Sequence, residues 1–157
     1  GDVHYVSLQH SEADIAVRFG RPKDENLVAR KVGEIPFGIY AGPNYLASTD
    51  PENYEWISVE VGGVHGQKQQ KLKERLSHKE PIMVTNNPEL QWRAACGEIG
   101  LAVLPDFLGA LSNLIRLQDD YPMSAEIWLV THEDLRHSPA IRVVMDFLIS
   151  CFEAFKV

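Results

Sequence analysis

Apolar residues in this chain gather in short runs separated by glycine, proline and polar clusters, a pattern typical of short β-strands. The runs lie at residues 13–18, 27–32 with 35–41, 56–61, 82–85, 101–104 and 127–130. The run 127–130 (IWLV) is apolar at every position, as are strands that are covered on both faces. By contrast, 56–61 alternates apolar and polar residues like a half-buried strand. The longest extended segment is expected over residues 27–41.

Helices are predicted by start signals and by apolar stripes at steps of three and four residues. Asn87-Pro88 and Ser138-Pro139 each combine a capping side chain with a proline at the first helical position. The first helix ends before Gly100, and the second carries a single apolar stripe. That stripe consists of Ile141, Val144, Met145, Leu148, Phe152 and Phe155. Shorter helices are expected at residues 6–12, 45–46, 67–75 and 105–111.

The alternation of strands and helices indicates an α/β fold, and we expect its sheet to be mainly parallel. A chain of 157 residues fits one domain and can bury roughly two thirds of its unfolded surface. With 45% hydrophobic and 24% charged residues, the composition is that of an ordinary globular protein. No stretch approaches the ~20 apolar residues that a membrane span needs, and the N-terminus carries no export signal. We therefore expect no membrane partner and no export.

The formal net charge of −7 narrows the set of partners. A negative field repels phosphate, and tight nucleic-acid binding normally needs clustered Lys and Arg contacts. This chain alone is therefore not expected to bind DNA. The densest basic run lies at 67–75, where lysines and an arginine interleave with glutamines and only Leu72, followed by Leu76, is apolar. We interpret this run as the solvated face of a helix.

Cysteine, histidine and serine patterns give no sign of catalysis. Cys96 and Cys151 lie among apolar neighbours outside any CxxC motif, which predicts two reduced, partly buried thiols and suits the cytoplasm. The histidines are scattered without HExxH or similar metal-ligand spacing, and no GxSxG motif occurs. We therefore expect a protein that is not an enzyme and that holds no cofactor or metal.

Several segments, taken in their order and spacing, resemble the effector-binding domain of LysR-type bacterial transcription regulators. They are EADIAVRFG at 12–20, LVARKV at 27–32, YAGPNYL at 40–46, GEIGLAVLPD at 97–106, IWLV at 127–130 and SPAIRVVMDFL at 138–148. Each segment alone is weakly specific, but the set spans essentially the whole chain. The sequence is identified by this resemblance as the ligand-sensing part of such a regulator.

The resemblance implies the two-lobed α/β fold of type II periplasmic binding proteins, in which two crossover strands join the lobes and a small effector binds in the cleft. Lobe I would contain residues 1–38 and 130–157, and lobe II residues 39–129. The crossover strands would be residues 35–41 and 126–130, whose length and apolar character agree with that role.

The chain also departs from the family pattern. Family members begin with a winged helix-turn-helix and a linker helix, and their sensing domain opens with a strand, a helix and a second strand. These parts have no counterpart here, so lobe I would be incomplete and DNA would be bound only through the missing N-terminal domain. The missing parts usually help to bind the effector and to form the dimer. We expect a homo-oligomer for the full-length regulator, whereas a complete pocket and dimerisation of this chain stay open.

A candidate binding group stands at 85–87, where a predicted strand gives way to a helix N-terminus. Thr85, Asn86 and Asn87 could present hydroxyl and amide groups to an effector, beside free backbone amides and a partial positive charge. A carboxylate effector would suit that arrangement. Asn87 could instead only cap the helix, and for that residue alone capping is the favoured interpretation, although both roles can coexist.

A second group, Arg18, Phe19 and Gly20, follows the first predicted strand and by the resemblance faces the cleft. Arg18 could pair with an effector carboxylate or form a surface ion pair. Phe19 could line the pocket or belong to the core, and the core is favoured.

The predicted function is thus that of a sensing domain, which binds a small, anionic organic effector and controls DNA binding by a winged helix-turn-helix domain. The alternative is a solute-binding protein of a transport system, which shares the two-lobed fold. Such proteins are longer and exported, whereas this chain carries regulator-like motifs and no export signal.

Overall fold

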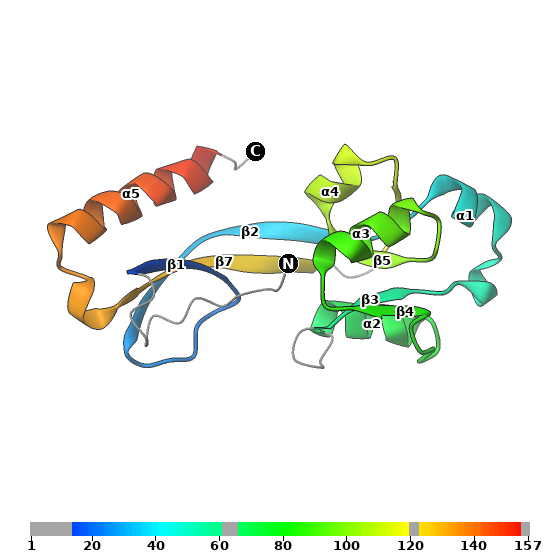
Figure 1. The fold of residues 1–157 in the computed structure, drawn as a ribbon, viewed down its shortest axis with the longest axis horizontal. Helices are drawn as coiled ribbons and strands as arrows, with labels where there is room; N and C mark the ends of the chain where they lie inside the picture. Colours follow the sequence, from blue (N-terminus) through cyan, green and yellow to red (C-terminus); the bar gives the residue numbers. More distant parts are fainter. Residues whose placement is uncertain (1–13, 61–65, 120–122, 155–157) are drawn as a thin grey trace. The chain divides into compact units, whose positions relative to one another are not determined.

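The computed structural model describes residues 14–60, 66–119 and 123–154, and Figure 1 shows the course of the chain. The strands are β1 (Ile15–Phe19), β2 (Leu27–Ala41), β3 (Ile57–Val59), β4 (Met83–Thr85), β5 (Ala102–Pro105), β6 (Ile115–Arg116) and β7 (Met123–His132). The α-helices are α1 (Pro43–Ser48), α2 (Gln67–Arg75), α3 (Pro88–Cys96), α4 (Asp106–Leu111) and α5 (Pro139–Ala154). Short 3-10 helices are η2 (Pro51–Asn53) and η3 (Glu133–Leu135).

The chain divides into two compact units. Among the described residues, unit 1 is formed by 36–60, 66–119 and Met123, and unit 2 by 14–35 with 124–154. Strand β2 passes from unit 2 into unit 1 at Pro36, and β7 returns the chain to unit 2 after Met123. The expected segment 27–41 is thus one continuous strand. The helix expected at 6–12 lies outside the described residues.

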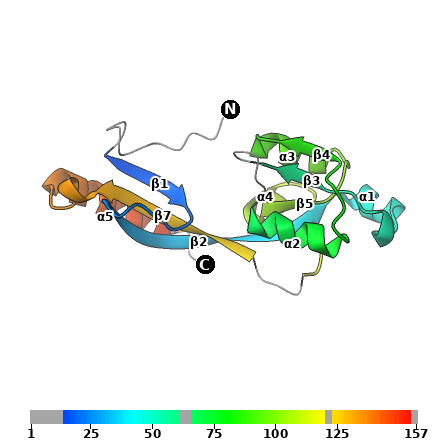
Figure 2. The same ribbon diagram turned by 90° about the horizontal axis from the view of Figure 1, so that it is seen from below.

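The core of unit 1 lies on both sides of β5, because successive side chains of a strand point to opposite faces. Leu101 and Val103 pack with Leu72 of α2 in one buried cluster, whereas Leu104 packs with Ala94 of α3 in another. Figures 1 and 2 show α2 and α3 on opposite sides of β5. Burying one such leucine contributes about 1.5–3 kcal/mol to folding. These contacts give unit 1 a layered core that holds β3 and β4 in place.

A glutamate with unusual backbone geometry ties α3 to α1. Glu98 has a φ of 67°, in the left-handed region that glycine adopts more readily. Its carboxylate accepts hydrogen bonds from the N–H of Tyr45, at 2.6 Å, and of Asn44, at 3.4 Å. The residue that precedes α1, Gly42, offers no side-chain cap, so Glu98 takes over that role. A Cβ atom on Gly42 would collide with the Glu98 carboxylate.

The expectation of a mainly parallel sheet is wrong. Strand β1 pairs antiparallel with β7, and β2 pairs antiparallel with both β5 and β6. Only β3 and β4 form a parallel ladder among the strand pairs recorded for the described residues. The physical reason is that β2 and β7 carry the chain between the units, so their sheet neighbours are not linked by the strand–helix–strand crossovers that parallel pairs require.

Unit 2 combines β1, β7 and the first part of β2 with α5. Strand β7 lies between β1 and β2 in the order of the sheet. One face of this sheet carries Val32, Ile127 and Leu129, which pack against the inner residues of α5. Those inner residues are Met145, Leu148, Ile149 and Phe152.

The predicted stripe on α5 needs one correction. Val144 does not belong to it, since its side chain is exposed and Ile149 takes the inner position. Phe155 lies outside the described residues. The prediction of two partly buried thiols is also wrong for Cys96, which is exposed, whereas Cys151 is half-buried.

Candidate ligand-binding site

One edge of unit 1 brings strand ends and helix starts together. Strands β3 and β4 run parallel, with Val59 beside Thr85 at their C-terminal ends, and α3 begins three residues after Thr85. Gln69, in the first turn of α2, joins this helix to the same edge by hydrogen bonds. The Gln69 side chain accepts from the N–H of Val59 at 2.8 Å and donates to the carbonyl of Val59 at 2.6 Å. Two helix N-termini therefore point toward the ends of two parallel strands, an arrangement that suits an anion.

A pair of buried glutamines stabilises this edge. The Gln91 side chain of α3 donates to the carbonyl of Ile57 at 3.3 Å and to the Gln69 side-chain oxygen at 3.4 Å. Buried polar groups rigidify a structure when they are hydrogen-bonded, so the pair fixes both helices to β3. Sequence reasoning missed these residues. The signal was available, because Gln91 shares its helix face with Ala94 and Ala95, which are buried.

The three predicted residues at 85–87 have different local roles. The Asn87 side chain accepts from the N–H of Glu89 at 2.9 Å, so the helix-capping interpretation of Asn87 is confirmed. The Thr85 hydroxyl oxygen accepts from the N–H of Asn87 at 3.1 Å, which leaves its own proton available to donate. Asn86 is exposed to solvent. This group therefore offers a hydroxyl donor and a side-chain amide beside the N-terminus of α3.

The second predicted group lies in unit 2, at the end of β1. Arg18 is 4.0 Å from Asp24, at the limit of an ion pair. Phe19 is 66% exposed, so its favoured assignment to the core is wrong. Gly20 has a φ of 85°, which only glycine adopts without strain, and its N–H donates to the carbonyl of Glu126 at 2.9 Å. Arg18, Phe19 and Gly20 belong to unit 2, whereas Thr85 belongs to unit 1.

On unit 2, Lys31 forms ion pairs with the carboxylates of Glu126 and Glu34. Lys31 lies 3.0 Å from the Glu126 carboxylate. The hydrogen bond to Glu34, and to a smaller extent the one to Glu126, raises the pKa of Lys31 above its ordinary value of 10.5. The hydrogen bond from Lys31 lowers the pKa of Glu126 below 4.5. Arg21 adds a cation–π contact, with its guanidinium carbon 5.7 Å from the centre of the Trp128 ring.

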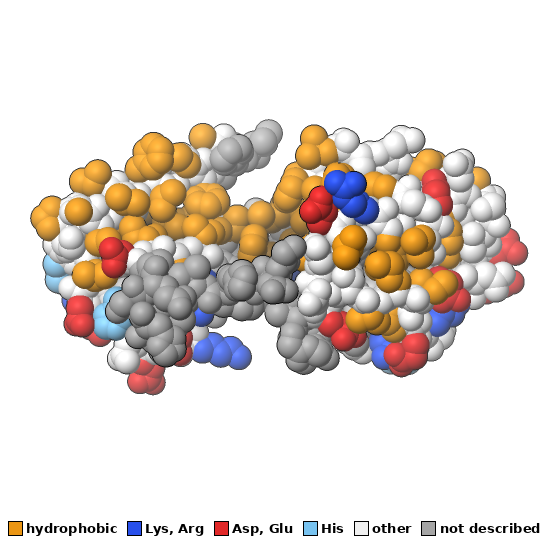
Figure 3. All heavy atoms as spheres, in the orientation of Figure 1, with side chains coloured by type: hydrophobic (Ala, Val, Ile, Leu, Met, Phe, Trp, Pro, Cys, Tyr) orange, Lys and Arg blue, Asp and Glu red, His pale blue; other side chains and the backbone are white. Residues whose placement is uncertain are grey.

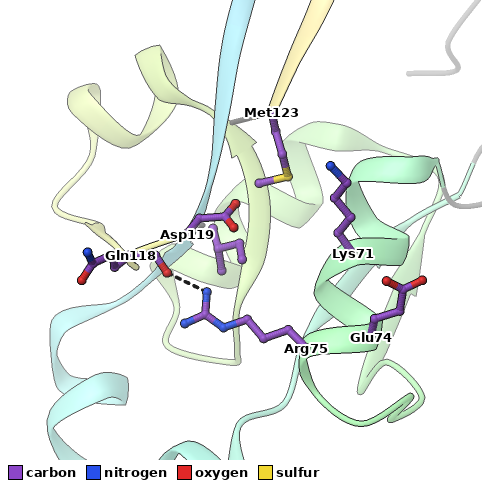
Figure 4. Close-up of a pocket in the computed structure, with 7 residues that line it drawn as sticks. Lys71, Glu74, Arg75, Gln118, Asp119 and Met123 are labelled. Atoms are coloured by element: carbon purple, nitrogen blue, oxygen red, sulfur yellow. Dashed lines mark hydrogen bonds between the residues drawn. The ribbon is translucent and has the colours of Figure 1, made fainter. Parts of the chain in front are cut away.

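The basic helix α2 was interpreted as a solvated face, and this is confirmed for Lys71 and Arg75, which are exposed, but wrong for Lys68. Lys68 lies 5.1 Å above the centre of the Phe37 ring, and burial lowers its pKa. Lys71 and Arg75 line a cavity of about 570 Å³ in unit 1, drawn in Figure 4. Lys73 pairs with Glu80 on the surface, as a solvated residue would. The labelled residues around the cavity are Lys71, Glu74, Arg75, Gln118, Asp119 and Met123.

Comparison with known proteins decides which interpretation of this architecture holds. The LysR substrate binding domain family matches residues 5–152. The chain belongs to this family. A relative is the Mau operon transcriptional activator of Paracoccus denitrificans, which is 28% identical over 149 residues, or 94% of this chain and 51% of that protein. The chain thus spans about half the length of this curated LysR relative.

Solved structures of LysR-type proteins share the fold. The effector domain of the regulator AmpR from Pseudomonas aeruginosa has a TM-score of 0.72 at 16% identity, with 96% of this chain and 77% of that chain covered. Full-length HypT from Salmonella typhimurium has a TM-score of 0.76 at 14% identity, with 94% of this chain and 55% of that chain covered. The resemblance read from the sequence motifs and the expected type II periplasmic-binding-protein-like α/β fold are therefore confirmed.

This LysR-type domain is a ligand-binding regulatory domain by its family, and the family is not an enzymatic one. Within the described residues, no group of three or more His, Cys, Asp or Glu side chains is placed to hold a metal ion. The same part of the chain contains no helix that is both long and apolar enough to cross a membrane.

Proposed function

We propose that this domain senses a small, anionic organic effector and thereby controls DNA binding by a winged helix-turn-helix domain of a longer regulator. The effector would contact Thr85, Asn86 and Asn87 in unit 1 and Arg18, Phe19 and Gly20 in unit 2. The observation that carries this proposal is the edge of unit 1, where the starts of α2 and α3 meet the ends of β3 and β4.

The chemistry of that edge favours an anion. The first turn of a helix exposes N–H groups and a partial positive charge. In α3, Pro88 has no N–H and the N–H of Glu89 bonds to Asn87, which leaves the N–H of Leu90 in the first turn. The Glu89 carboxylate would oppose an anion, but Arg93 holds it at 3.0 Å on the helix surface. A carboxylate at this edge would therefore accept from the Thr85 hydroxyl and from the N–H of Leu90. In unit 2, Arg18 is the candidate charged partner for a carboxylate, because its contact with Asp24 is long.

The proposal extends to the whole regulator. The relative from Paracoccus denitrificans is named a transcriptional activator, which supports a role in gene control. We propose that the longer protein acts in the cytoplasm as a homo-oligomer and that it meets DNA through the winged helix-turn-helix domain. The net charge of −7 supports a separate DNA-binding domain, since this domain repels phosphate.

The test is calorimetry on the full-length regulator with a series of small organic acids. For the acid that binds, Thr85→Val is expected to lower the affinity about threefold to tenfold, or about 0.5–1.5 kcal/mol, because one hydrogen bond is lost. Thr49→Val, at the end of α1, is the matched control and should bind as the wild type does. Unchanged affinity in both Thr85→Val and Arg18→Ala would place the site elsewhere. Circular dichroism must show that each variant is folded.

A further inference from the structure

Helix α2 is followed by two consecutive residues whose backbone is left-handed. Ser77 and His78 have φ values of 59° and 62°. This region favours glycine, because a Cβ atom comes too close to the backbone there. Glu98 shares the left-handed region, but its carboxylate makes hydrogen bonds to the start of α1 that offset the cost. The side chains of Ser77 and His78 are exposed to solvent, so the turn after α2 stores strain.

Hydrogen bonds of the last helical turn close this strained cap. The N–H of Ser77 donates to the carbonyl of Glu74 at 3.1 Å, and that of His78 donates to the carbonyl of Lys73 at 2.8 Å. A bond that spans five residues in this way is typical of a helix end that is finished by a left-handed residue. Glycine ordinarily occupies such a position, so the cap of α2 closes at a cost that a glycine would not have.

The chain after the cap is anchored to the core of unit 1, which keeps the strain in place. The carbonyl of Lys79 accepts from the indole N–H of Trp56 at 2.7 Å, and Trp56 is completely buried. The ammonium group of Lys79 donates to the carbonyl of Tyr54 at 2.8 Å. A strained backbone persists only where its surroundings determine it. Because Lys79 is fixed, the strain is released only if the last turn of α2 moves.

A buried hydroxyl in β3 also opposes the packing of α2. Ser58 is completely buried, and its hydroxyl oxygen has no hydrogen-bond partner within the described part of the chain. Because alternate residues of a strand share a face, Ser58 points to the same side as Trp56, which packs with Leu72 of α2. A buried hydroxyl without a partner destabilises the packed state, and water would satisfy it once α2 moves away.

Few apolar contacts hold α2 against this tendency. Of its nine residues only Gln69 and Leu72 are buried. Leu76, which follows the helix, packs partly buried against the same core. A helix that is held by one buried leucine and by polar contacts opens more readily than the core of its domain.

We propose that α2 and its cap form a conformational switch, in which the last turn of α2 unwinds and lifts from β3 in a minor open state. In that state Ser77 and His78 take ordinary backbone angles, the Ser58 hydroxyl meets water and Leu76 leaves the core. Gln69 joins the other end of α2 to the candidate effector edge, so opening loosens that edge. This last link rests on the proposed function, whereas the opening itself does not.

The test is hydrogen exchange of single amides, followed by NMR on the 157-residue chain without ligand. Leu76 and Gly97 follow α2 and α3 at matching positions. Their N–H groups donate to the carbonyls of Leu72 and Arg93 at 3.0 and 2.9 Å. We expect the amide of Leu76 to be at least about tenfold less protected than that of Gly97, because α2 opens locally.

Variants of the cap test the strain itself. Ser77→Gly and His78→Gly should each raise the protection of Leu76 about fivefold, since glycine adopts the left-handed backbone without a penalty. Ser58→Ala removes the hydroxyl without a partner and should raise it about threefold. Glu74→Gly is the matched control, because position 74 is exposed within the helix, and it should lower the protection about fivefold.

The outcomes separate the switch from an ordinary helix end. Equal protection of Leu76 and Gly97 in the wild type would overturn the proposal. So would glycine at 77 and 78 that leaves Leu76 no better protected, because no strain would then have been released. A rise in Glu74→Gly would also overturn it, since glycine would then act on something other than the cap. No ligand is added, so a failure of the effector proposal leaves these results as they are.

Discussion

Units 1 and 2 bury their apolar residues to very different extents. In unit 1, Trp56, Leu72 and Leu101 are completely buried, and helices cover both sides of β5. In unit 2, helix α5 packs on the sheet with one side, yet none of its residues is fully buried. Its other side exposes Val143 and Phe147 to 69% and 65%. A helix that is apolar on most sides is normally enclosed by its surroundings, and α5 is not enclosed within the described residues.

The strand register shows which apolar side chains of unit 2 are left exposed by α5. Val17 stands beside Leu129, and Phe19 beside Ile127, so all of these side chains point to the face that α5 packs on. Helix α5 covers Leu129 and Ile127 but leaves Val17 and Phe19 50% and 66% exposed. Figure 3 shows hydrophobic side chains gathered over α5 and the strands beside it. Within the described residues, apolar side chains are therefore buried on both sides of β5 in unit 1, whereas unit 2 leaves part of one apolar sheet face and one side of α5 exposed.

The largest expected effect concerns the core of unit 1. Leu101→Ala should destabilise the chain by about 2–5 kcal/mol, because it removes a completely buried side chain and leaves a cavity. Guanidinium unfolding followed by circular dichroism measures the change. Leu111→Ala is the matched control, since Leu111 is 79% exposed, and it should change stability by less than about 0.5 kcal/mol. Equal losses in both variants would contradict the assignment of the core.

A smaller loss is expected in unit 2. Leu148 packs on the sheet from α5 but remains half-buried, so Leu148→Ala should cost about 1–2 kcal/mol, less than Leu101→Ala. The same unfolding experiment provides the comparison. If Leu148→Ala were as damaging as Leu101→Ala, the two units would be equally well packed and the contrast between them would fail.

The exposed side of α5 should matter more for association than for stability. Phe147→Ser is expected to change the free energy of unfolding by no more than about 0.5 kcal/mol, because the ring is largely in solvent. The same variant should reduce binding of a hydrophobic dye and lower the average mass in light scattering. Asp146→Ser, at the neighbouring exposed position, is the control and should leave both readings unchanged. Unaltered dye binding in Phe147→Ser would show that the dye does not bind to this face of α5.

The smallest effect is expected from the ion pair on unit 2. The pKa of Glu126 is lowered in the folded chain, so its stabilising contribution is present above the ordinary carboxyl pKa of 4.5 and is lost as the pH falls. The difference in Tm between wild type and Glu126→Gln should therefore be positive at pH 6 and shrink toward pH 3. The pair is exposed to solvent, so the whole difference should be small. A difference that grows on acidification would contradict the sign.

Local features of the fold could be predicted from the sequence, because they depend on neighbouring residues. Asn87 before Pro88 marked the start of α3, and Ser138 before Pro139 marked the start of α5. The side of α5 that packs inward was also largely predictable from its spacing, apart from Val144. The family segments predicted the two-lobed fold class.

Features that depend on distant residues could not be predicted. The antiparallel pairing of β1 with β7 joins segments more than a hundred positions apart, and no local pattern encodes strand direction. The cavity beside α2 was missed because Arg75 finds its partner at Gln118, far along the chain. The Gln69 and Gln91 pair was missed because glutamine on a helix is ordinarily a solvent-exposed residue.

The contact between Glu98 and Gly42 has a consequence for how this sequence can change. A side chain at position 42 would take the space of the Glu98 carboxylate, so the carboxylate would have to swing away from the start of α1. Glycine at 98 would suit the left-handed backbone there but would leave the first N–H groups of α1 without their acceptor. The two positions are therefore coupled, because a side chain at 42 displaces the carboxylate at 98, and α1 then needs another acceptor for its first N–H groups.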